Sequence, residues 1–320
     1  MNTGKSVQLL QDTFDINAIY AQKIIGMVDP SNLLEEAKIF IEEKPKPFVK
    51  WVGGKRQLLK QFRLMDLYPP EQFNVKTGRY FEPFVGGGAV FFDLLPEKSF
   101  LSDLNSELVI TYIIVTNDVD KLINSLKKYK YEKDFFLKVR SLQPKQLPNV
   151  EIASRFIYLN RTCFNGMYRV NSKGEFNVPF GKYSNPLICD EVNLRRVSKA
   201  LQNVEINCQD YKMIIKKARK GDFVYFDPPY YPINKTSSFT TYTKEAFLDK
   251  EQIELRDAYL KLHKKGCFVM LSNSNTPFIN KIYNEIEKYG IKINEVLAGR
   301  AINSKGTKRG KITEILVTNY

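Results

Sequence analysis

The sequence predicts an α/β protein, a doubly wound sheet interrupted by an inserted, mainly helical domain. From Arg79 onward, five short β-rich runs alternate with helical stretches, as parallel strands joined by crossover helices require. Two further runs near the end suit an antiparallel pair at one edge. One stretch, residues 106–195, breaks the alternation. The seven expected strands are Arg79–Glu82, Ser99–Asp103, Val204–Gln209, Asp222–Asp227, Cys267–Ser272, Ile291–Leu297 and Ile312–Asn319.

The segment before the sheet has a composition of its own. Residues 1–44 carry four basic and seven acidic side chains, a net charge of −3, against +14 for the whole chain. Apolar residues between Leu33 and Ile41 recur at helical spacing, which predicts a short amphipathic helix that Pro45 and Pro47 end. The chain therefore divides into an acidic, helical extension (1–45), a sheet domain (46–105 and 196–320) and the insert (106–195).

The insert is cationic in one part and polar in another. Between Lys121 and Lys145 there are eight basic residues and only two acidic ones. Such a stretch is either a solvated helix face or a surface that faces a polyanion. The following segment, Asn160 to Tyr183, is rich in polar and aromatic residues, Gly and Asn, and departs from the helical pattern.

Composition narrows the function. The 49 Lys and Arg against 35 Asp and Glu point to a polyanionic partner such as nucleic acid. Because His263 is the single histidine, a metal site with two imidazoles is excluded, and a Ser-His-Asp hydrolase needs His263 itself as its base. The four cysteines form no C-x-x-C pair, so neither a zinc cluster nor a disulfide framework is expected. We predict no metal site.

The chain also lacks the usual targeting patterns. Its first twenty residues have no apolar core of signal-peptide length, and no run of about 18 apolar residues occurs. We therefore expect a cytoplasmic protein that does not span a membrane.

The first strand leads into a glycine-rich turn. In Tyr80–Gly88, Gly86 and Gly88 precede a predicted helix over Ala89–Leu95, which is the topology of a nucleotide site at the carboxyl end of a strand. Asp103 ends the next strand, where an acid accepts hydrogen bonds from ribose hydroxyls. The pattern is neither G-x-G-x-x-G nor a phosphate loop, so a nucleoside without phosphates fits better.

Asp227-Pro228-Pro229-Tyr230 follows the apolar run Phe223–Phe226 and is the most specific signal in the chain. Two consecutive prolines donate no backbone hydrogen bonds and hold φ near about −65°, so they form a stiff turn. That turn presents the Asp227 carboxylate and the Pro228 carbonyl as acceptors beside the flat face of Tyr230. Recognition of an exocyclic NH₂ group on a planar base needs two acceptors and a stacking surface of this kind. The alternative interpretation is an ordinary turn at the end of a strand.

The motifs resemble those of the D12 class of DNA N6-adenine methyltransferases, the bacterial DNA adenine methylases, over nearly all of Pro47–Tyr320. Phe48–Lys55 is similar to the Lys-Trp-x-Gly-Gly-Lys segment near the family's start. Asn160–Arg169 and Gly174–Pro179 resemble its motif in the insert, and the motif order matches its α arrangement. The resemblance implies a seven-stranded S-adenosylmethionine-dependent methyltransferase sheet, in which the insert is the DNA target-recognition domain.

The same resemblance implies S-adenosylmethionine as the methyl donor, with the contacting positions at Trp51, Lys55, Asp103 and Asp227. A cationic Lys55 suits the methionine carboxylate, although from the residues alone Lys55 could be a surface charge and Trp51 a core residue. Asp210, after the third strand, is a candidate acceptor for the cofactor's adenine amino group, or else a helix N-cap before Tyr211.

The implied reaction is direct transfer of a methyl group from sulfonium to adenine N6 by a site-specific, adenine-specific DNA methyltransferase. Hydrogen bonds from the NH₂ group to Asp227 and Pro228 would localise a nitrogen lone pair that is otherwise delocalised into the ring. Because N6 is paired inside double-stranded DNA, the adenine must be flipped out, and Tyr230 is the expected stacking platform.

Segment 160–183 resembles the DNA-reading hairpin of family members that methylate adenine in GATC. That match implies guanine contacts from Lys50 and Arg169, apolar base contacts from Met167 and Pro179, and a position beside the extruded base for Phe164 and Asn165. Arginine paired with guanine is the commonest specific base contact, and a phosphate contact is the alternative for Arg169.

Two more segments suit DNA binding. The Ser/Thr-rich segment Thr236–Thr243 looks like the family's loop near the flipped base, and its composition suits a flexible lid. The basic run from Arg300 to Lys311 suits backbone phosphates.

Alternatives remain open from the sequence. Methylation of cytosine N4 uses the same amine chemistry, but enzymes of that type usually have Ser where Asp227 stands. An RNA or protein-glutamine methyltransferase would share the acceptor motif without the 160–183 segment, and a DNA-binding protein without activity is a different class again. The sequence does not distinguish housekeeping from restriction–modification, in which a cognate restriction endonuclease would be a genetic partner. It also leaves open the oligomeric state and whether residues 1–45 serve dimerisation or partner binding.

Overall fold

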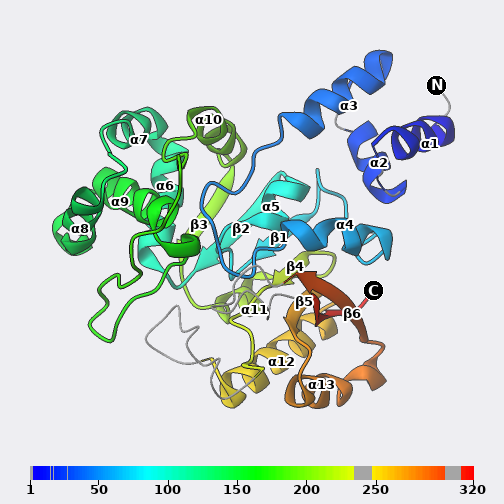
Figure 1. The fold of residues 1–320 in the computed structure, drawn as a ribbon. Helices are drawn as coiled ribbons and strands as arrows, with labels where there is room; N and C mark the ends of the chain where they lie inside the picture. Colours follow the sequence, from blue (N-terminus) through cyan, green and yellow to red (C-terminus); the bar gives the residue numbers. More distant parts are fainter. Residues whose placement is uncertain (1–2, 15, 17, 27, 234–246, 300–310) are drawn as a thin grey trace.

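The protein, described from a computed structural model, is built on one mixed seven-stranded sheet (Figure 1). The structure describes residues 3–14, 16, 18–26, 28–233, 247–299 and 311–320. The strands are β1 (Arg79–Glu82), β2 (Lys98–Asp103), β3 (Val204–Cys208), β4 (Phe223–Phe226), β5 (Phe268–Ser274), β6 (Lys292–Gly299) and β7 (Lys311–Thr318). Their order is β3-β2-β1-β4-β5-β7-β6. All seven predicted strands are present, with ends within two residues of those expected.

The direction of the strands places the functional motifs at one edge of the sheet. β1 to β5 are parallel, whereas β7 runs antiparallel between β5 and β6. After β1 the chain continues to β2 and β3 on one side of β1, whereas β4 and β5 lie on the other side of β1. The order therefore reverses beside β1, where the crevice outside the carboxyl ends of parallel strands is the usual place for a ligand.

Helices cover both faces of the sheet, so it is doubly wound as predicted (Figure 1). The helices of the sheet and insert are α4 (Arg56–Leu64), α5 (Ala89–Leu94), α6 (Ser106–Asn117), α7 (Val119–Leu126), α8 (Lys133–Ser141), α9 (Asn149–Thr162), α10 (Glu191–Ala200), α11 (Met213–Lys217), α12 (Asp249–Lys264) and α13 (Pro277–Asn284). Short 3₁₀ turns lie at Pro30–Asn32, Pro144–Gln146, Phe164–Gly166 and Glu287–Tyr289.

Alternation along the strands divides the apolar side chains between two cores. Tyr80 and Tyr225 join the core formed with α4, α5 and α6, whereas the neighbouring Phe81 and Phe226 join the core formed with α11, α12 and α13. Successive strand residues point to opposite faces, so a strand covered by helices on both sides is apolar throughout. This explains why the run Phe223–Phe226 is fully buried.

The insert shares its core with the sheet. α6 packs on β2 and β3 and also on α9. The buried Arg155 of α9 forms an ion pair with Glu107 of α6, with 2.9 Å between Nη1 and Oε2. Tyr168, which follows α9, donates a hydrogen bond to the same carboxylate at 2.9 Å. α6 is therefore the element through which the insert attaches to the sheet, and the domain boundary at residue 105 stays a prediction.

The acidic extension forms three helices around a small core of its own. They are α1 (Thr3–Phe14), α2 (Ala18–Ile25) and α3 (Leu33–Glu42). Leu10, Ala21, Ile24 and Ala37 lie at the centre of this core. The predicted amphipathic helix corresponds to α3, whereas the other two helices lie in the extension expected to be helical but were not predicted individually. In Figure 1 the three helices lie at the upper right, on the other side of the molecule from α7, α8 and α9. Among the described residues no helix has the length and apolar character needed to cross a membrane.

Candidate functional site

The glycine turn after β1 is held by the end of β2. Gly86 and Gly88 have φ values of 47° and 68°, in the left-handed region that favours glycine. The Gly86 N–H donates to Asp103 Oδ2 at 3.1 Å, and Asp103 Oδ1 accepts from the Asn105 N–H at 2.9 Å. Burial raises the pKa of Asp103, while these backbone N–H groups act in the opposite direction. The carboxylate predicted to face a ribose is thus fixed beside the turn.

Trp51 lies directly against this turn. A Cβ atom added at Gly86 would come within 2.6 Å of the Trp51 indole, so a side chain at this position would displace the ring. On the insert side, the indole stacks with Phe156 and Tyr168, with ring centroids 6.5 Å and 6.2 Å away. The only tryptophan therefore joins the glycine turn to the insert.

Lys55 and Asp227 form a close ion pair at the end of β4. Lys55, which is only 1% exposed, places its Nζ 2.7 Å from Asp227 Oδ1 and 3.0 Å from Oδ2. Burial raises the pKa of Asp227 to about 6, and the neighbouring ammonium opposes that rise. The sequence interpretation gave Lys55 a cofactor carboxylate and Asp227 an amine. In the structure the two side chains are partners, and Lys55 is not a surface charge.

Tyr230 is anchored at both its ring and its hydroxyl group. The Lys55 Nζ lies 4.7 Å from the centre of the ring, a cation–π contact. The Tyr230 hydroxyl donates to Glu314 Oε2 at 2.8 Å. Glu314, on β7, was missed by sequence reasoning because 84 residues separate it from Tyr230. The Tyr230 ring is therefore held in one orientation.

A second buried acid lies behind the turn. Glu82, at the end of β1, accepts hydrogen bonds from the Tyr80 hydroxyl at 2.8 Å and the Phe91 N–H at 3.1 Å. Burial raises its pKa to about 8, and the Asp227 charge adds to the effect. This residue was also missed, although its position before Pro83 in the glycine motif could have suggested it.

Asp210 lies after β3, beside the strand that carries Asp103. Its carboxylate accepts from the Lys212 N–H at 2.7 Å, and α11 begins only at Met213. A side chain that accepts from the N–H two residues ahead makes the hydrogen bond of an N-cap, so the alternative role before Tyr211 fits this geometry, and the contact of Asp210 with the cofactor stays a prediction. Tyr211 itself stacks on Phe84 with ring centroids 5.3 Å apart, which adds an aromatic surface near the same edge.

Lys50 is packed beneath the turn that begins the predicted DNA-reading hairpin. Its backbone N–H donates to Asn160 Oδ1 at 2.7 Å, and Asn160 Nδ2 donates to the Lys50 carbonyl at 2.8 Å and the Gly166 carbonyl at 2.9 Å. The Lys50 Nζ lies 4.4 Å from the centre of the Tyr183 ring. Burial lowers the pKa of Lys50, and Arg161 adds to that effect.

The other predicted DNA contacts lie along the same hairpin. Asn165 has a φ of 55°, unusual for a residue other than glycine, and the adjacent Phe164 is 48% exposed. The Phe164 N–H donates to the carbonyl of the exposed Pro179 at 2.9 Å. Arg169 Nε donates to Asn177 Oδ1 at 2.8 Å, while Met167 packs partly against the core. The structure therefore groups the six predicted residues around one hairpin.

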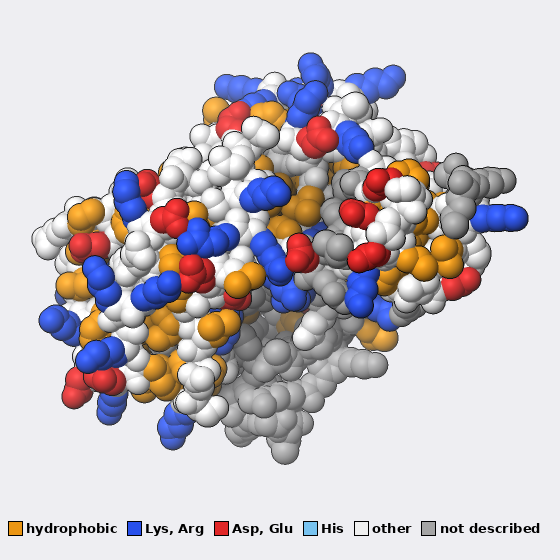
Figure 2. Space-filling model, turned by 90° about the horizontal axis from the view of Figure 1, so that it is seen from above, with side chains coloured by type: hydrophobic (Ala, Val, Ile, Leu, Met, Phe, Trp, Pro, Cys, Tyr) orange, Lys and Arg blue, Asp and Glu red, His pale blue; other side chains and the backbone are white. Residues whose placement is uncertain are grey.

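Two predicted features fall outside the described residues. They are the Ser/Thr-rich segment Thr236–Thr243 and the basic run from Arg300, of which only Lys311 belongs to the described part. On the face that Figure 2 shows, Lys and Arg side chains are interspersed with Asp and Glu. On this face, net charge alone therefore does not mark a DNA-binding surface.

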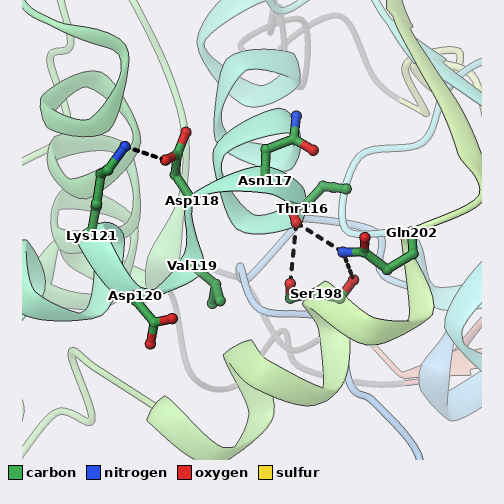
Figure 3. Close-up of a pocket in the computed structure, with 8 residues that line it drawn as sticks. All are labelled: Thr116, Asn117, Asp118, Val119, Asp120, Lys121, Ser198 and Gln202. Atoms are coloured by element: carbon green, nitrogen blue, oxygen red, sulfur yellow. Dashed lines mark hydrogen bonds and ion pairs between the residues drawn. The ribbon is translucent and has the colours of Figure 1, made fainter.

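One hollow in the described part of the structure lies apart from this site. It has a volume of about 440 Å³ and lies where α6 ends and α7 begins, beside Ser198 and Gln202 of α10 and the turn after it (Figure 3). On one side of it Lys121 forms an ion pair with Asp118, three residues away, and on the other side the Ser198 hydroxyl donates to the Thr116 carbonyl. Because α6 begins at the carboxyl end of β2, the far end of this helix lies away from the glycine turn. Among the described residues no cluster of three or more His, Cys, Asp or Glu side chains could hold a metal ion.

A mixed seven-stranded sheet flanked by helices, with a glycine turn and an Asp-Pro-Pro-Tyr motif at its parallel carboxyl edge, defines an α/β S-adenosylmethionine-dependent methyltransferase fold. A family profile described as D12 class N6 adenine-specific DNA methyltransferase matches residues 51–300. The chain belongs to this family and is an adenine-specific DNA methyltransferase.

Three curated relatives match this chain over nearly their whole lengths. The type II methyltransferase M.MjaIII of Methanocaldococcus jannaschii is 47% identical, over 86% of this chain and 99% of its own. The type II methyltransferase M1.LlaDCHI of Lactococcus lactis is 43% identical, over 90% and 99%. The DNA adenine methylase of Haemophilus influenzae is 35% identical, over 85% and 93%.

Proposed function

We propose that the protein transfers the methyl group of S-adenosylmethionine to N6 of an adenine flipped out of double-stranded DNA, within GATC. The observation that carries this proposal is the end of β4. There the Asp227 carboxylate, paired with a buried Lys55, is followed by the Pro228 carbonyl and by the anchored ring of Tyr230. This set contains two acceptors and a stacking surface, which match an amino group on a planar base.

Asp227 acts on the amine by accepting one of its hydrogen bonds while the Pro228 carbonyl accepts the other. Two acceptors placed in advance favour the geometry in which the nitrogen lone pair is available, and they need no reorganisation during the reaction. Lys55 contributes by keeping the Asp227 carboxylate ionised, since its ammonium opposes the rise in pKa that burial causes.

Bound S-adenosylmethionine supplies an electrophilic methyl group on sulfonium. The residues that would hold it are Trp51, Lys55, Gly86, Gly88, Asp103, Asp210 and Asp227. The donor set fits a nucleoside: Asp103 uses one hydrogen bond on each carboxylate oxygen and retains lone pairs for ribose hydroxyls. The stacked pair of Phe84 and Tyr211 adds a surface suited to a purine.

Tyr230 would receive the flipped adenine. Base flipping costs unstacking energy, which an aromatic surface in the pocket partly recovers. Because the Tyr230 hydroxyl is hydrogen-bonded to Glu314 and its ring packs on the Lys55 ammonium, the ring loses little freedom when the base stacks on it.

The hairpin supports GATC as the target. Arg169 has a guanidinium near the surface, held only by Asn177, which suits bidentate pairing with guanine. Lys50 lies next to the turn that carries the exposed Phe164 and Asn165, so base contacts and the extruded adenine would share one side of the hairpin. The remaining expected contacts are apolar, from Met167 and Pro179.

The alternatives are less favoured. The family assignment argues against cytosine N4 methylation, and the intact pair of Lys55 and Asp227 argues against an inactive DNA-binding protein. Relatives named as type II methyltransferases favour a restriction–modification role, with a cognate restriction endonuclease as genetic partner.

The test is transfer of labelled methyl from S-adenosylmethionine to two matched duplexes, one containing GATC and one with those four bases rearranged, followed by identification of the modified base. N6-methyladenine confined to the GATC duplex is the expected result. Methyladenine on both duplexes would contradict the hairpin assignment, and methylcytosine would contradict the chemistry.

A further inference from the structure

We propose that Gln252 and Asn273 are positioning residues for methyl transfer, because their paired amides fix the backbone of the Pro-Pro-Tyr-Tyr turn. Gln252 lies on α12 and Asn273 on β5, and neither belongs to the motifs singled out by sequence. The inference rests on the proposed function, since it gives a reason for the placement of the Pro228 carbonyl and of Tyr230.

The two amides form a continuous chain of hydrogen bonds ending on the turn. Both side chains are 0% exposed. Asn273 Nδ2 donates to Gln252 Oε1 at 2.9 Å, and Gln252 Nε2 donates to the Pro229 carbonyl at 3.0 Å. Asn273 Oδ1 accepts from the Tyr231 N–H at 3.3 Å, and Ser274 Oγ donates to the Tyr231 carbonyl at 2.8 Å.

The turn needs such support because it leaves the sheet. Pairing of β4 with β5 ends at Phe226 and Leu271, so the residues that follow have no ladder bonds from that pairing. Two consecutive prolines also offer no N–H groups that could anchor the turn. The Gln252 and Asn273 amides supply the missing anchors on the two residues that flank Tyr230.

The pattern of anchors is selective. Gln252 binds the Pro229 carbonyl, Asn273 binds the Tyr231 N–H and Ser274 binds the Tyr231 carbonyl, whereas the Pro228 carbonyl is not among the groups that these side chains engage. The amides thus hold the two residues that flank Tyr230 and leave for the substrate amine the carbonyl that the proposed reaction requires. In a methyl transfer that depends on alignment, a displacement of about 1 Å can cost roughly 10²-fold in rate.

Asn319 provides a matched control. It is also a side-chain amide that braces β5, but at the start of the strand: its Oδ1 accepts from the Val269 N–H at 2.7 Å and its Nδ2 donates to the Cys267 carbonyl at 2.9 Å. Asn319→Leu removes an equivalent set of hydrogen bonds without touching the turn, so it measures what loss of stability alone does to the rate.

The experiment compares Gln252→Met, Asn273→Leu and Asn319→Leu in the full-length protein. The single-turnover rate is measured on an unmethylated duplex that the wild-type protein methylates, together with the melting temperature and the affinities for that duplex and for S-adenosylmethionine. We expect the first two variants to lose roughly 10–100-fold in rate with little change in either affinity. Asn319→Leu should lower the melting temperature and leave the rate almost unchanged.

Gln252→Glu is a conservative variant with a pH signature. A protonated Glu can donate to the Pro229 carbonyl and accept from Asn273, whereas an ionised Glu donates nothing. The rate of this variant relative to wild type should therefore rise as the pH falls. This ratio tests positioning even if the apolar variants fail to fold.

Several outcomes would overturn the inference. They are rates near wild type for the folded Gln252 and Asn273 variants, a rate loss shared by Asn319→Leu, and a pH-independent ratio for Gln252→Glu. Failure of the proposed function would show in different proteins. If the wild-type protein did not methylate DNA, or if Asp227→Ala were fully active, the site itself would be rejected, and this inference with it.

Discussion

Two regions are built in opposite ways: the candidate catalytic edge, at the carboxyl ends of β1 and β4, and the hairpin of residues 160–183 that we propose reads DNA. At the catalytic edge, side chains from distant segments hold one another, as Lys55, Asp227 and Tyr230 do. In the hairpin the backbone is held from within by the buried Asn160, while Phe164 is 48% exposed and Arg169 is bonded only to Asn177 at the surface. The candidate catalytic groups are therefore preorganised, whereas the side chains proposed to read DNA remain free to adjust to it.

This difference predicts that damage at the catalytic edge affects rate and not DNA affinity. Asp227→Ala removes the principal acceptor and leaves the Lys55 ammonium without its partner 2.7 Å away. We expect the single-turnover rate to fall by at least roughly 10³-fold. Gel-shift titration should give almost the wild-type affinity for DNA.

Asp227→Asn is the control for that experiment. It keeps the shape and one carbonyl acceptor, so it should fold like wild type and lose less activity than the alanine variant. A parallel loss of DNA binding in Asp227→Ala would instead show that the residue has a structural role and would remove the contrast between the two regions.

Burying an acid beside the candidate catalytic edge should also lower the stability of the protein once that acid ionises. Glu82 makes this cost measurable. The pKa of Glu82 is raised to about 8 in the folded protein, against 4.5 as its ordinary value. The folded state therefore binds a proton that the unfolded state releases between these two pH values. Since the unfolded state binds fewer protons there, the free energy of unfolding falls as pH rises from about 4.5 to about 8.

Glu82→Gln should remove this pH dependence. The amide oxygen can still accept from Tyr80 and Phe91, and no charge has to be buried at high pH. Relative to wild type, we expect a gain on the order of 2–4 kcal/mol in unfolding free energy at about pH 9 and little change at about pH 4.5. Urea denaturation across this range tests it, and parallel curves for the two proteins would contradict it.

In the hairpin, the expected effect is a loss of discrimination. Arg169→Ala deletes the guanidinium predicted to read a guanine, so the preference for that base pair should fall by about 1–3 kcal/mol, roughly 5–150-fold. The rate at saturating DNA should change much less. Competition between GATC and single-substituted duplexes measures this, and Lys173→Ala, also in an exposed part of the hairpin, is the control. Equal weakening on every duplex would identify Arg169 as a phosphate contact.

The pH dependence of the methylation rate again distinguishes the candidate catalytic edge from the hairpin, because it depends on Asp227. Because the pKa of Asp227 is about 6, its acceptor is lost as the carboxylate takes up a proton below that pH. The single-turnover rate should therefore be about tenfold lower at about pH 5 than on the plateau at higher pH. Asp227→Asn should lack this step. If the step persisted in that variant, another group would be responsible.

The sequence predicted what is local and left out what is distant. The glycine turn, the Asp-Pro-Pro-Tyr motif and all seven strands follow from short patterns, and the structure contains each of them. Glu314, Gln252 and Asn273 have no local signal, because their significance arises only when β5, β7 and α12 meet the turn. The pairing of Lys55 with Asp227 was likewise hidden by a separation of 172 residues.

The first two N-terminal helices, α1 and α2, were not predicted individually, although the extension was expected to be helical and their signal was present. Val7, Leu10 and Phe14 recur at helical spacing, as do Ala21, Ile24 and Ile25 in the next helix. Each stretch is short and lacks the prolines that marked the end of α3. Their pattern becomes decisive only when the three helices are considered together as one small core.

The smallest effect is expected from removing those helices. The core that they share contains no residue of the sheet's two cores, and the family profile begins only at residue 51. A protein starting at Lys46 loses Lys44, which pairs with Asp93, but Asp93 keeps its contacts with Arg63 and Tyr68. The ion pair of Arg196 with Glu43, 3.6 Å long, is solvent-exposed and worth about 0–1 kcal/mol. Methylation rate and DNA affinity should therefore stay within about twofold of wild type.

Light scattering decides the remaining role: an unchanged mass would eliminate dimerisation through these helices, whereas a dimer that becomes a monomer would make the extension an assembly element and add a third region to the comparison.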